Sequence, residues 1–422
     1  MTLWILATLP VALAAENAGS KPASENERGM PDRIIKPRRV IALQSEPEDK
    51  ETGRYDWGPS VMRDGHLYRM WWVRQGGGGS KRFAYRATLP DGEVFEFTYP
   101  DYGDRIYYAE SRDGLTWPGI AGDDFAGRPE EYDPDANGPL MVLRPAESRH
   151  QIHHVGRPSV IKVEGVFYMY YEAPSDYRVT RGPDGQPKVG EEYGNAVFLA
   201  TSPDGKRWRH WPDDTDPQPL LKPPADGPTK YGYGQPSVCY RDGRFVLHYV
   251  NSHSGPGDFM IRIESMEPFF KQAKTWPRSL TPATQPAGAP AGRSTSVPAG
   301  AVARFAQTDV RYLGDVFYLV RPAYGTGNLG VLATRDGVFH ADADAHLPAQ
   351  VFPQIAVRDP RGQNYRERLF PAFLTDPHGR ILVEEGHAVL FYSSGRGFKE
   401  HAYTWDLQRC EVDVEILQTM AR

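Results

Sequence analysis

Short aromatic-rich runs, each preceded by a polar turn, recur along the 422-residue chain. In the clearest copies the phrase Pro-Ser-Val leads through a Gly-containing turn into such a run, and these copies begin at Pro59-Ser60-Val61, Pro158-Ser159-Val160 and Pro236-Ser237-Val238. Aromatic and β-branched residues on both sides of a turn predict an antiparallel hairpin. A unit that recurs in this way predicts a repeat architecture.

Weaker copies of the hairpin run from Asp309 to Val320 and from Phe370 to Tyr392. A second phrase, Ser-x-Asp-Gly-x-x-Trp, ends the first two units at Ser111–Trp117 and Ser202–Trp208, with a degenerate form at Thr334–Phe339. Each unit therefore predicts a hairpin, a third strand, and an Asp-Gly turn into a fourth strand. Together the units predict an all-β fold, a five-bladed β-propeller with long inter-strand loops.

The propeller is expected to cover residues 41–422, with its blades at about 41–145, 146–225, 226–275, 304–350 and 351–422. Residues 277–303 are rich in Pro, Ala, Gly and Ser without a hydrophobic period, which predicts a flexible insertion. The polar and charged segment 15–40 predicts a flexible lead-in.

Residues 1–14 resemble a secretory signal peptide, because an apolar run ends in Ala12-Leu13-Ala14, although no Lys or Arg precedes it. We therefore expect a secreted or periplasmic protein. The run is too short to span a bilayer, and no other stretch is apolar enough, so no membrane span is expected.

Composition narrows the classes of partner. The chain has 49 Lys and Arg against 54 Asp and Glu, a net charge of −5, so it lacks the basic field of a nucleic-acid-binding protein. Aromatic residues make up 12%, which suits both sheet packing and stacking on sugar faces. Cys239 and Cys410 are the only thiols, and two buried free thiols are favoured over a disulfide.

The order of Pro-Ser-Val, turn, aromatic strand and Ser-x-Asp-Gly-x-x-Trp resembles the five-bladed propeller glycoside hydrolases, the clan around families 43, 32, 62, 117 and 130. The resemblance covers nearly all of the chain after residue 50. It implies an exo-acting hydrolase of a poly- or oligosaccharide that requires no cofactor. A structural calcium or another divalent metal in the channel is left open.

Members of this clan carry an acid at the first inner strand, commonly directly before the Pro. Here Asp56 lies three residues before Pro59, Arg157 stands where family 43 places its second acid, and Gly234 or Gln235 stands where it places the third. The chain therefore departs from the family 43 triad. This departure leaves two alternatives open, a non-catalytic glycan-binding propeller and a structural or protein-interaction propeller.

Glycoside hydrolysis needs two carboxyl groups, one protonated and one ionised. In a propeller, the starts of the first strands and the ends of the second strands gather at one mouth. We expect Asp56 to act as the base or nucleophile and Glu172 as the acid, with Asp309 the next candidate. The alternatives are a turn role for Asp56 and structural salt bridges for Glu172 or Asp309.

Other residues near this mouth are candidates for sugar contacts: Trp57, Trp72, His153, His154, Arg157, Asp176, Tyr233, Gln235, His248, Arg311 and Arg321. The planar guanidinium of Arg157 suits a carboxylate or sulfate, which would make the carbohydrate acidic or sulfated. The alternative for Arg157 is neutralisation of Asp56 and Asp309, and for the aromatic residues it is packing between blades. The histidines are expected to hydrogen-bond the sugar rather than to bind a metal.

Overall fold

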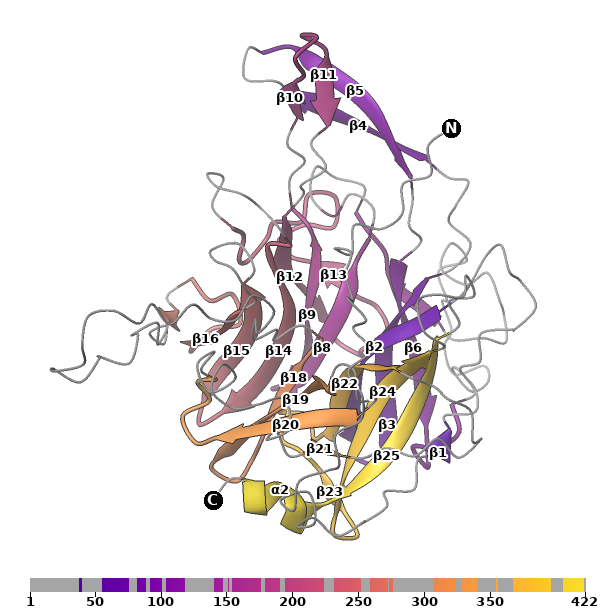
Figure 1. Ribbon diagram of the computed structural model, residues 1–422, viewed down its shortest axis with the longest axis vertical. Helices are drawn as coiled ribbons and strands as arrows, with labels where there is room; N and C mark the ends of the chain where they lie inside the picture. The colour runs from indigo at the N-terminus through magenta and orange to yellow at the C-terminus, as the bar shows by residue number, and fades with distance from the viewer. Residues whose placement is uncertain are drawn as a thin grey trace, which may run out of the picture. The chain divides into compact units, whose positions relative to one another are not determined.

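A computed structural model describes the chain over residues 38–39, 55–75, 82–88, 92–100, 104–117, 140–146, 151, 154–175, 179–189, 194–223, 231–251, 259–271, 273–275, 307–323, 328–339, 354–355, 367–395 and 405–420. Within these residues the chain is almost entirely β-strand, and the only helix is α2 (Val414–Met420) (Figure 1). The all-β prediction is confirmed. The predicted signal peptide and the insertion 277–303 lie outside the described residues.

The main strands form one nine-stranded sheet and three four-stranded sheets. One parallel strand pairing divides the nine-stranded sheet into two antiparallel groups, which gives five groups that we number repeats 1 to 5. Repeat 1 contains β2 (Tyr55–Asp64), β3 (Leu67–Gln75), β6 (Asp104–Ser111) and β7 (Leu140–Leu143). Repeat 2 contains β8 (Gly156–Val163), β9 (Val166–Pro174), β12 (Asn195–Ser202) and β13 (Arg209–His210). Repeat 3 contains β14 (Tyr233–Arg241), β15 (Arg244–Asn251), β16 (Phe259–Ser265) and β17 (Lys274–Thr275).

Repeat 4 contains β18 (Asp309–Leu313), β19 (Val316–Ala323), β20 (Asn328–Thr334) and β21 (Gln354–Ile355). Repeat 5 contains β22 (Glu367–Thr375), β24 (His387–Gly395), β25 (Trp405–Asp413) and β1 (Arg38–Arg39), and β23 (Val383–Glu384) also pairs with β24. Strand β1 lies within the segment 15–40 that we expected to be a flexible lead-in. Its pairing with β25 joins Arg38 and Arg39 to the last strand of the chain's described residues.

Two further hairpins stand apart from the repeats. One pairs β4 (Arg82–Thr88) with β5 (Val94–Pro100), and the other pairs β10 (Val179–Arg181) with β11 (Pro187–Val189). An ion pair between Arg181 and Glu93 connects the two hairpins. They are insertions in repeats 1 and 2, which accounts for part of the extra length of these repeats.

The first strands of successive repeats contact one another, β2 with β8, β8 with β14, β14 with β18, and β18 with β22. The last contact returns to the start, because β22 pairs in parallel with β2 through Val61–Leu374 and Met62–Thr375. The five first strands therefore contact one another in cyclic order.

The serine of the Pro-Ser-Val phrase ties neighbouring first strands together. Ser60 Oγ accepts a hydrogen bond from the Val160 N–H at 3.0 Å, and Ser159 Oγ accepts one from the Val238 N–H at 2.9 Å. Asp309 takes the place of the serine in repeat 4, and its Oδ2 accepts a hydrogen bond from the Phe373 N–H at 3.0 Å. Ser60, Ser159 and Asp309 thus each satisfy a buried backbone N–H of the next repeat, whereas the hydroxyl of Ser237 has no partner among the described residues.

The glycines of the Asp-Gly turns make a second set of ties. The Gly205 carbonyl accepts a hydrogen bond from Trp71 Nε1 at 2.8 Å, and the Gly337 carbonyl accepts one from His248 Nε2 at 2.9 Å. Trp71 belongs to repeat 1 and Gly205 to repeat 2, while His248 belongs to repeat 3 and Gly337 to repeat 4. Each hydrogen bond therefore joins two neighbouring repeats. Burial lowers the pKa of His248 to about 3, so the ring is neutral and its Nε2 carries the hydrogen that is donated.

Replacing Ser159 with Ala is expected to lower the free energy of unfolding by about 1–3 kcal/mol, because the Val238 N–H and an Arg311 amino group lose their acceptor. Ser237 provides the matched control. Its buried hydroxyl has no hydrogen-bond partner among the described residues, so Ser237→Ala should change stability by less than about 0.5 kcal/mol. Urea unfolding of the two variants measures the difference, and equal losses would contradict the role of the serine.

Both cysteines are buried and free, which confirms the predicted thiol state. Cys239 lies in β14 and Cys410 lies in β25. Over the part of the chain that the structure describes, no helix has the length and apolarity needed to cross a bilayer.

Candidate functional site

One residue in each repeat has a left-handed backbone conformation at the position before the Pro of Pro-Ser-Val, or at the equivalent position. The φ angles are +60° at Gly58, +51° at Arg157, +54° at Gln235, +62° at Gln307 and +52° at Phe370. Only glycine adopts this conformation freely, and elsewhere it costs about 1–3 kcal/mol. Four residues other than glycine have this unfavourable conformation at equivalent positions of the repeats. Such a recurrence indicates that these positions have a role beyond packing.

These positions bring side chains from different repeats into contact. The Arg157 guanidinium lies 4.2 Å from the centre of the Phe370 ring and 5.4 Å from the Trp57 ring, and the two rings lie 4.8 Å apart. The Gln307 N–H donates to the Gln235 side-chain oxygen. We call Trp57, Arg157, Gln235, Gln307 and Phe370 the mouth cluster.

Glu172, near the end of β9, adjoins the mouth cluster and is only 3% exposed. Its Oε2 accepts hydrogen bonds from Tyr231 Oη at 2.5 Å and from the Gln235 N–H at 2.7 Å. Its Oε1 lies 3.4 Å from Arg157 Nε. Burial and the neighbouring Glu172 charge raise the pKa of Tyr231 well above its usual value, so the phenol remains a donor.

Gly234 makes room for the Glu172 carboxylate. A Cβ atom at Gly234 would overlap Glu172 Oε2, so any side chain there would displace the carboxylate. The small residue directly before Gln235 is therefore part of the site.

Asp56 is 1% exposed and is held by three donor contacts. Its Oδ1 accepts hydrogen bonds from Trp72 Nε1 and Arg74 Nε, both at 2.7 Å, and its Oδ2 accepts one from Arg74 Nη2 at 3.1 Å. The paired contact with Arg74 is the two-pronged geometry that arginine forms with carboxylates. Asp56 directly precedes Trp57 in β2. Among the described residues its carboxylate is held by Trp72 and Arg74, and none of these hydrogen bonds comes from a member of the mouth cluster.

Several buried polar atoms around the mouth cluster have no hydrogen-bond partner among the described residues. They are Trp57 Nε1, Gln307 Oε1, Thr308 Oγ1 and Ser393 Oγ. Buried polar groups are normally paired, because an unpaired donor or acceptor costs free energy. A ligand that carries several hydroxyl groups would satisfy such a set.

Four of the predicted residues are used elsewhere in the fold. Trp72 and His248 are fully buried, and each already donates its hydrogen bond, to Asp56 and to Gly337 respectively. Asp309 pairs with Arg311 at 3.0 Å, and both belong to the ties between first strands. The structure therefore brings none of these four to the mouth cluster as an open group.

The remaining predicted residues lie in varied places. Tyr233 packs on Tyr249, with ring centres 5.2 Å apart, and Arg321 lies in β19 beside Gly330. Burial and the charge of Arg105 lower the pKa of His154 to about 3. His153 and Asp176 lie outside the described residues.

Tyr231 and Gln307 were not predicted as site residues. A signal for Gln307 exists, because Gln307-Thr308-Asp309-Val310 aligns with Gln235-Pro236-Ser237-Val238. No repeated pattern marks Tyr231, whose role depends on its contact with Glu172.

A metal ion would need a cluster of ligating side chains. Within the ranges that the structure describes, His, Cys, Asp and Glu residues form no group of three that could hold one.

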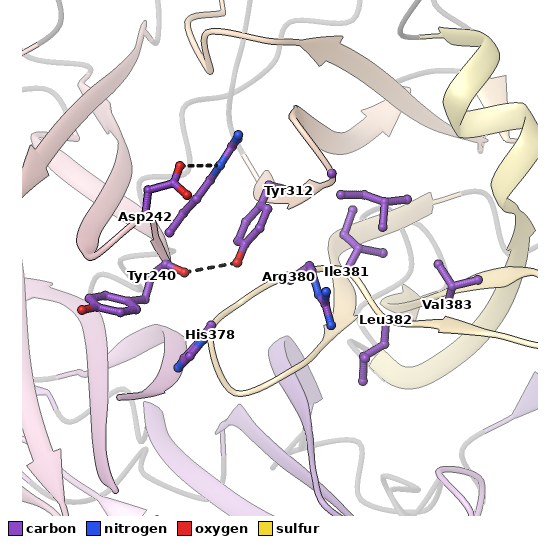
Figure 2. Close-up of a pocket in the computed structure, with 11 residues that line it drawn as sticks. Tyr240, Asp242, Tyr312, His378, Arg380, Ile381, Leu382 and Val383 are labelled. Carbon is purple, nitrogen blue, oxygen red and sulfur yellow. Dashed lines mark hydrogen bonds and ion pairs between the residues drawn. The ribbon is translucent and has the colours of Figure 1, made fainter. Parts of the chain in front are cut away.

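A cavity of about 640 Å³ lies at the other end of the first strands, lined in part by Tyr240, Tyr312, His378 and Arg380 (Figure 2). Strand β14 runs from Gln235 at the mouth to Arg241 at this cavity, a separation of roughly 20 Å. Polar groups in the cavity are paired with protein groups: Arg241 with Asp242 at 3.2 Å, and Tyr312 Oη with the Tyr240 carbonyl at 3.2 Å. The cavity is therefore separate from the two buried carboxylates.

No family model and no curated protein sequence matches the chain. Solved structures do. A family 117 glycoside hydrolase, Zg3597 from Zobellia galactanivorans, aligns over 90% of this chain and 90% of its own, with 12% identity and a TM-score of 0.52. The α-L-arabinofuranosidase PaAbf62A from Podospora anserina, solved with cellotriose, aligns over 90% of this chain and 96% of its own, with 12% identity and a TM-score of 0.50.

A third solved structure, the complex of BT0996 with RGII, aligns over 90% of this chain and 92% of its own, with 14% identity and a TM-score of 0.50. At such identities the likeness shows the fold alone. The chain therefore shares the fold of propeller glycoside hydrolases, which confirms at the level of fold the resemblance that the repeated motifs predicted.

Proposed function

We propose that the chain is an exported glycoside hydrolase that binds the end of a poly- or oligosaccharide at the mouth cluster. The observation that carries the proposal is the buried carboxylate of Glu172, which contacts Arg157 and Gln235 in a strained cluster whose hydrogen-bonding groups are partly unpaired among the described residues. We propose Asp56, a second buried carboxylate one residue before Trp57, as its catalytic partner. The fold shared with glycoside hydrolases supports it.

The proposal includes a propeller of five blades, one for each repeat. The cyclic contacts of the first strands and the parallel pairing of β22 with β2 support this count. In such a fold the five left-handed positions surround one axis, so side chains far apart in sequence face the same hollow.

In the proposed reaction Glu172 protonates the glycosidic oxygen as the bond to the anomeric carbon breaks. Asp56, held by Arg74, either takes a proton from the water that attacks the anomeric carbon or attacks this carbon itself. In the second case water then displaces Asp56 from the sugar and gives its proton to Glu172. Asp309 is given no part, because its carboxylate is one of the ties between neighbouring first strands, through the Phe373 N–H.

A glycan-binding propeller without hydrolysis is the second candidate. It is supported by the five left-handed positions, which are Gly58, Arg157, Gln235, Gln307 and Phe370 and include no carboxylate. The protein donors around Asp56 and Glu172 also suit carboxylates that only hold the site together.

A screen of the protein against a panel of polysaccharides, with binding and released sugar measured together, tests the proposal. On a glycan found in this way, Trp57→Phe should weaken affinity about 3- to 10-fold, because it keeps the ring but removes the unpaired N–H. The control is Asp242→Asn in the distant cavity, which should leave affinity unchanged. Equal affinities of parent and Trp57→Phe would place the glycan elsewhere, and binding to no glycan would refute the proposal.

A further inference from the structure

Arg157 is fixed in the mouth cluster from several sides. Its backbone is held at a φ of +51°, and its guanidinium lies over the rings of Phe370 and Trp57 at 4.2 and 5.4 Å. The side chain is 12% exposed. A strained backbone and two flanking aromatic rings restrict the orientation of the Arg157 guanidinium plane.

Among the described residues, the hydrogen-bonding capacity of Arg157 is largely unused. A guanidinium carries five N–H donors. Its charged partner among the described residues is Glu172, whose Oε1 lies 3.4 Å from Nε, outside hydrogen-bonding geometry. The two terminal amino groups make no hydrogen bond with any described residue.

Glu172 does not depend on Arg157 for its hydrogen bonds. Its Oε2 is already served by Tyr231 and by the Gln235 N–H. Asp56 is likewise served by Arg74 and Trp72. Neither Glu172 Oε2 nor the Asp56 carboxylate therefore uses the terminal amino groups of Arg157, which have no acceptor among the described residues.

We infer that the terminal amino groups of Arg157 bind an anionic substituent, a carboxylate or a sulfate, on the sugar at the mouth cluster. The inference rests on the proposed function and names its substrate class, an acidic glycan. The planar fork of two amino groups matches the paired oxygens of either substituent. The unpaired Trp57 Nε1, which belongs to the ring beside the guanidinium, can bind a neighbouring hydroxyl.

Matched pairs of glycans test the inference. Oligogalacturonides and glucuronoxylan fragments are paired with their carboxyl-reduced forms, and sulfated galactan fragments are paired with their desulfated forms. The affinity for each glycan is measured by calorimetric titration of the parent, of Arg157→Gln and of Arg157→Lys. The parent should bind at least one acidic glycan about 10- to 100-fold more tightly than its neutral partner. Arg157→Gln should bring this ratio to within about 3-fold of unity, and Arg157→Lys should keep part of it, since it keeps the charge but loses the fork.

The pair that shows the preference identifies the substituent as carboxylate or sulfate. Arg335→Gln, at a side chain that is 72% exposed on the degenerate Asp-Gly turn, should keep the ratio of the parent. A parent that binds neutral and acidic partners equally, or an Arg157→Gln that keeps the full preference, would overturn the inference and leave the proposed function standing. A folded parent that binds neither form of any glycan would overturn both.

Discussion

Replacing Glu172 with Gln is expected to lower the rate of sugar release about 10²- to 10⁴-fold, the usual contribution of a positioned acid or base. Glutamine has nearly the shape of glutamate, but it cannot transfer a proton to the glycosidic oxygen. Glu172 Oε2 accepts hydrogen bonds from Tyr231 Oη and the Gln235 N–H. If the amide nitrogen of glutamine took the position of Oε2, it would place its own hydrogens against these two donors. The measurement is kcat/KM on the glycan identified by the screen, together with the melting temperature.

Asp56→Asn is the companion variant, and it separates the two candidate functions. If the protein is a hydrolase, Asp56→Asn should keep binding within about 3-fold of the parent while release falls by a similar 10²- to 10⁴-fold. If the protein only binds glycans, the parent itself releases no sugar. Release that is unchanged in both variants would remove Asp56 and Glu172 from the chemistry.

Acidification is expected to destabilise the fold between about pH 6.5 and pH 3. Burial lowers the pKa of His248 from 6.5 to about 3 and that of His210 to about 4. The unfolded chain therefore binds protons in this window that the folded chain does not. The free energy of unfolding is at its full value above pH 6.5 and falls with decreasing pH, by about 1.4 kcal/mol per pH unit for a fully buried histidine such as His248.

Urea unfolding at pH 7.5, 6.0 and 5.0 measures this dependence. His248→Phe keeps an aromatic ring against Phe317 and Phe339 but has no group to protonate. The free energy of unfolding should therefore change less steeply with pH, because unfolding takes up one proton fewer. It should also cost stability at pH 7.5, because the Gly337 carbonyl loses its donor. A stability that does not change between pH 7.5 and pH 5.0 would contradict the neutral buried histidines.

The hairpins and turns of the fold could be predicted from the sequence, because the residues that determine them are close together in the chain. The hairpins and Asp-Gly turns follow from turn residues and aromatic runs a few positions apart. The C-terminal helix α2 does not follow from the sequence pattern, because the alternation Val412-Asp413-Val414-Glu415-Ile416 is typical of a strand, whereas β25 ends at Asp413. There Asp413 accepts a hydrogen bond from the Glu415 N–H, as a residue that caps a helix does.

The candidate site was predicted in part. Asp56, Glu172, Arg157 and Gln235 were placed at one mouth from their positions relative to Pro-Ser-Val. Asp309 was grouped with them because it is acidic and starts a strand. Aligned with the repeats, however, it occupies the position of the serine, and its contacts are those of the serine.

Pairings between distant residues could not be predicted. The contact of Tyr231 with Glu172 joins positions 59 residues apart, and the ring of Phe370 reaches Arg157 from the last repeat. Such contacts depend on how whole repeats pack, which no local pattern records.

A crystal structure of Glu172→Gln with a bound oligosaccharide of the identified glycan tests the central claim most directly. The account predicts a sugar ring in contact with Trp57 and Arg157, with its glycosidic oxygen within hydrogen-bonding distance of residue 172. A sugar bound in the cavity beside Tyr312 and Arg380, or one at the mouth with its glycosidic oxygen remote from residue 172, would contradict it.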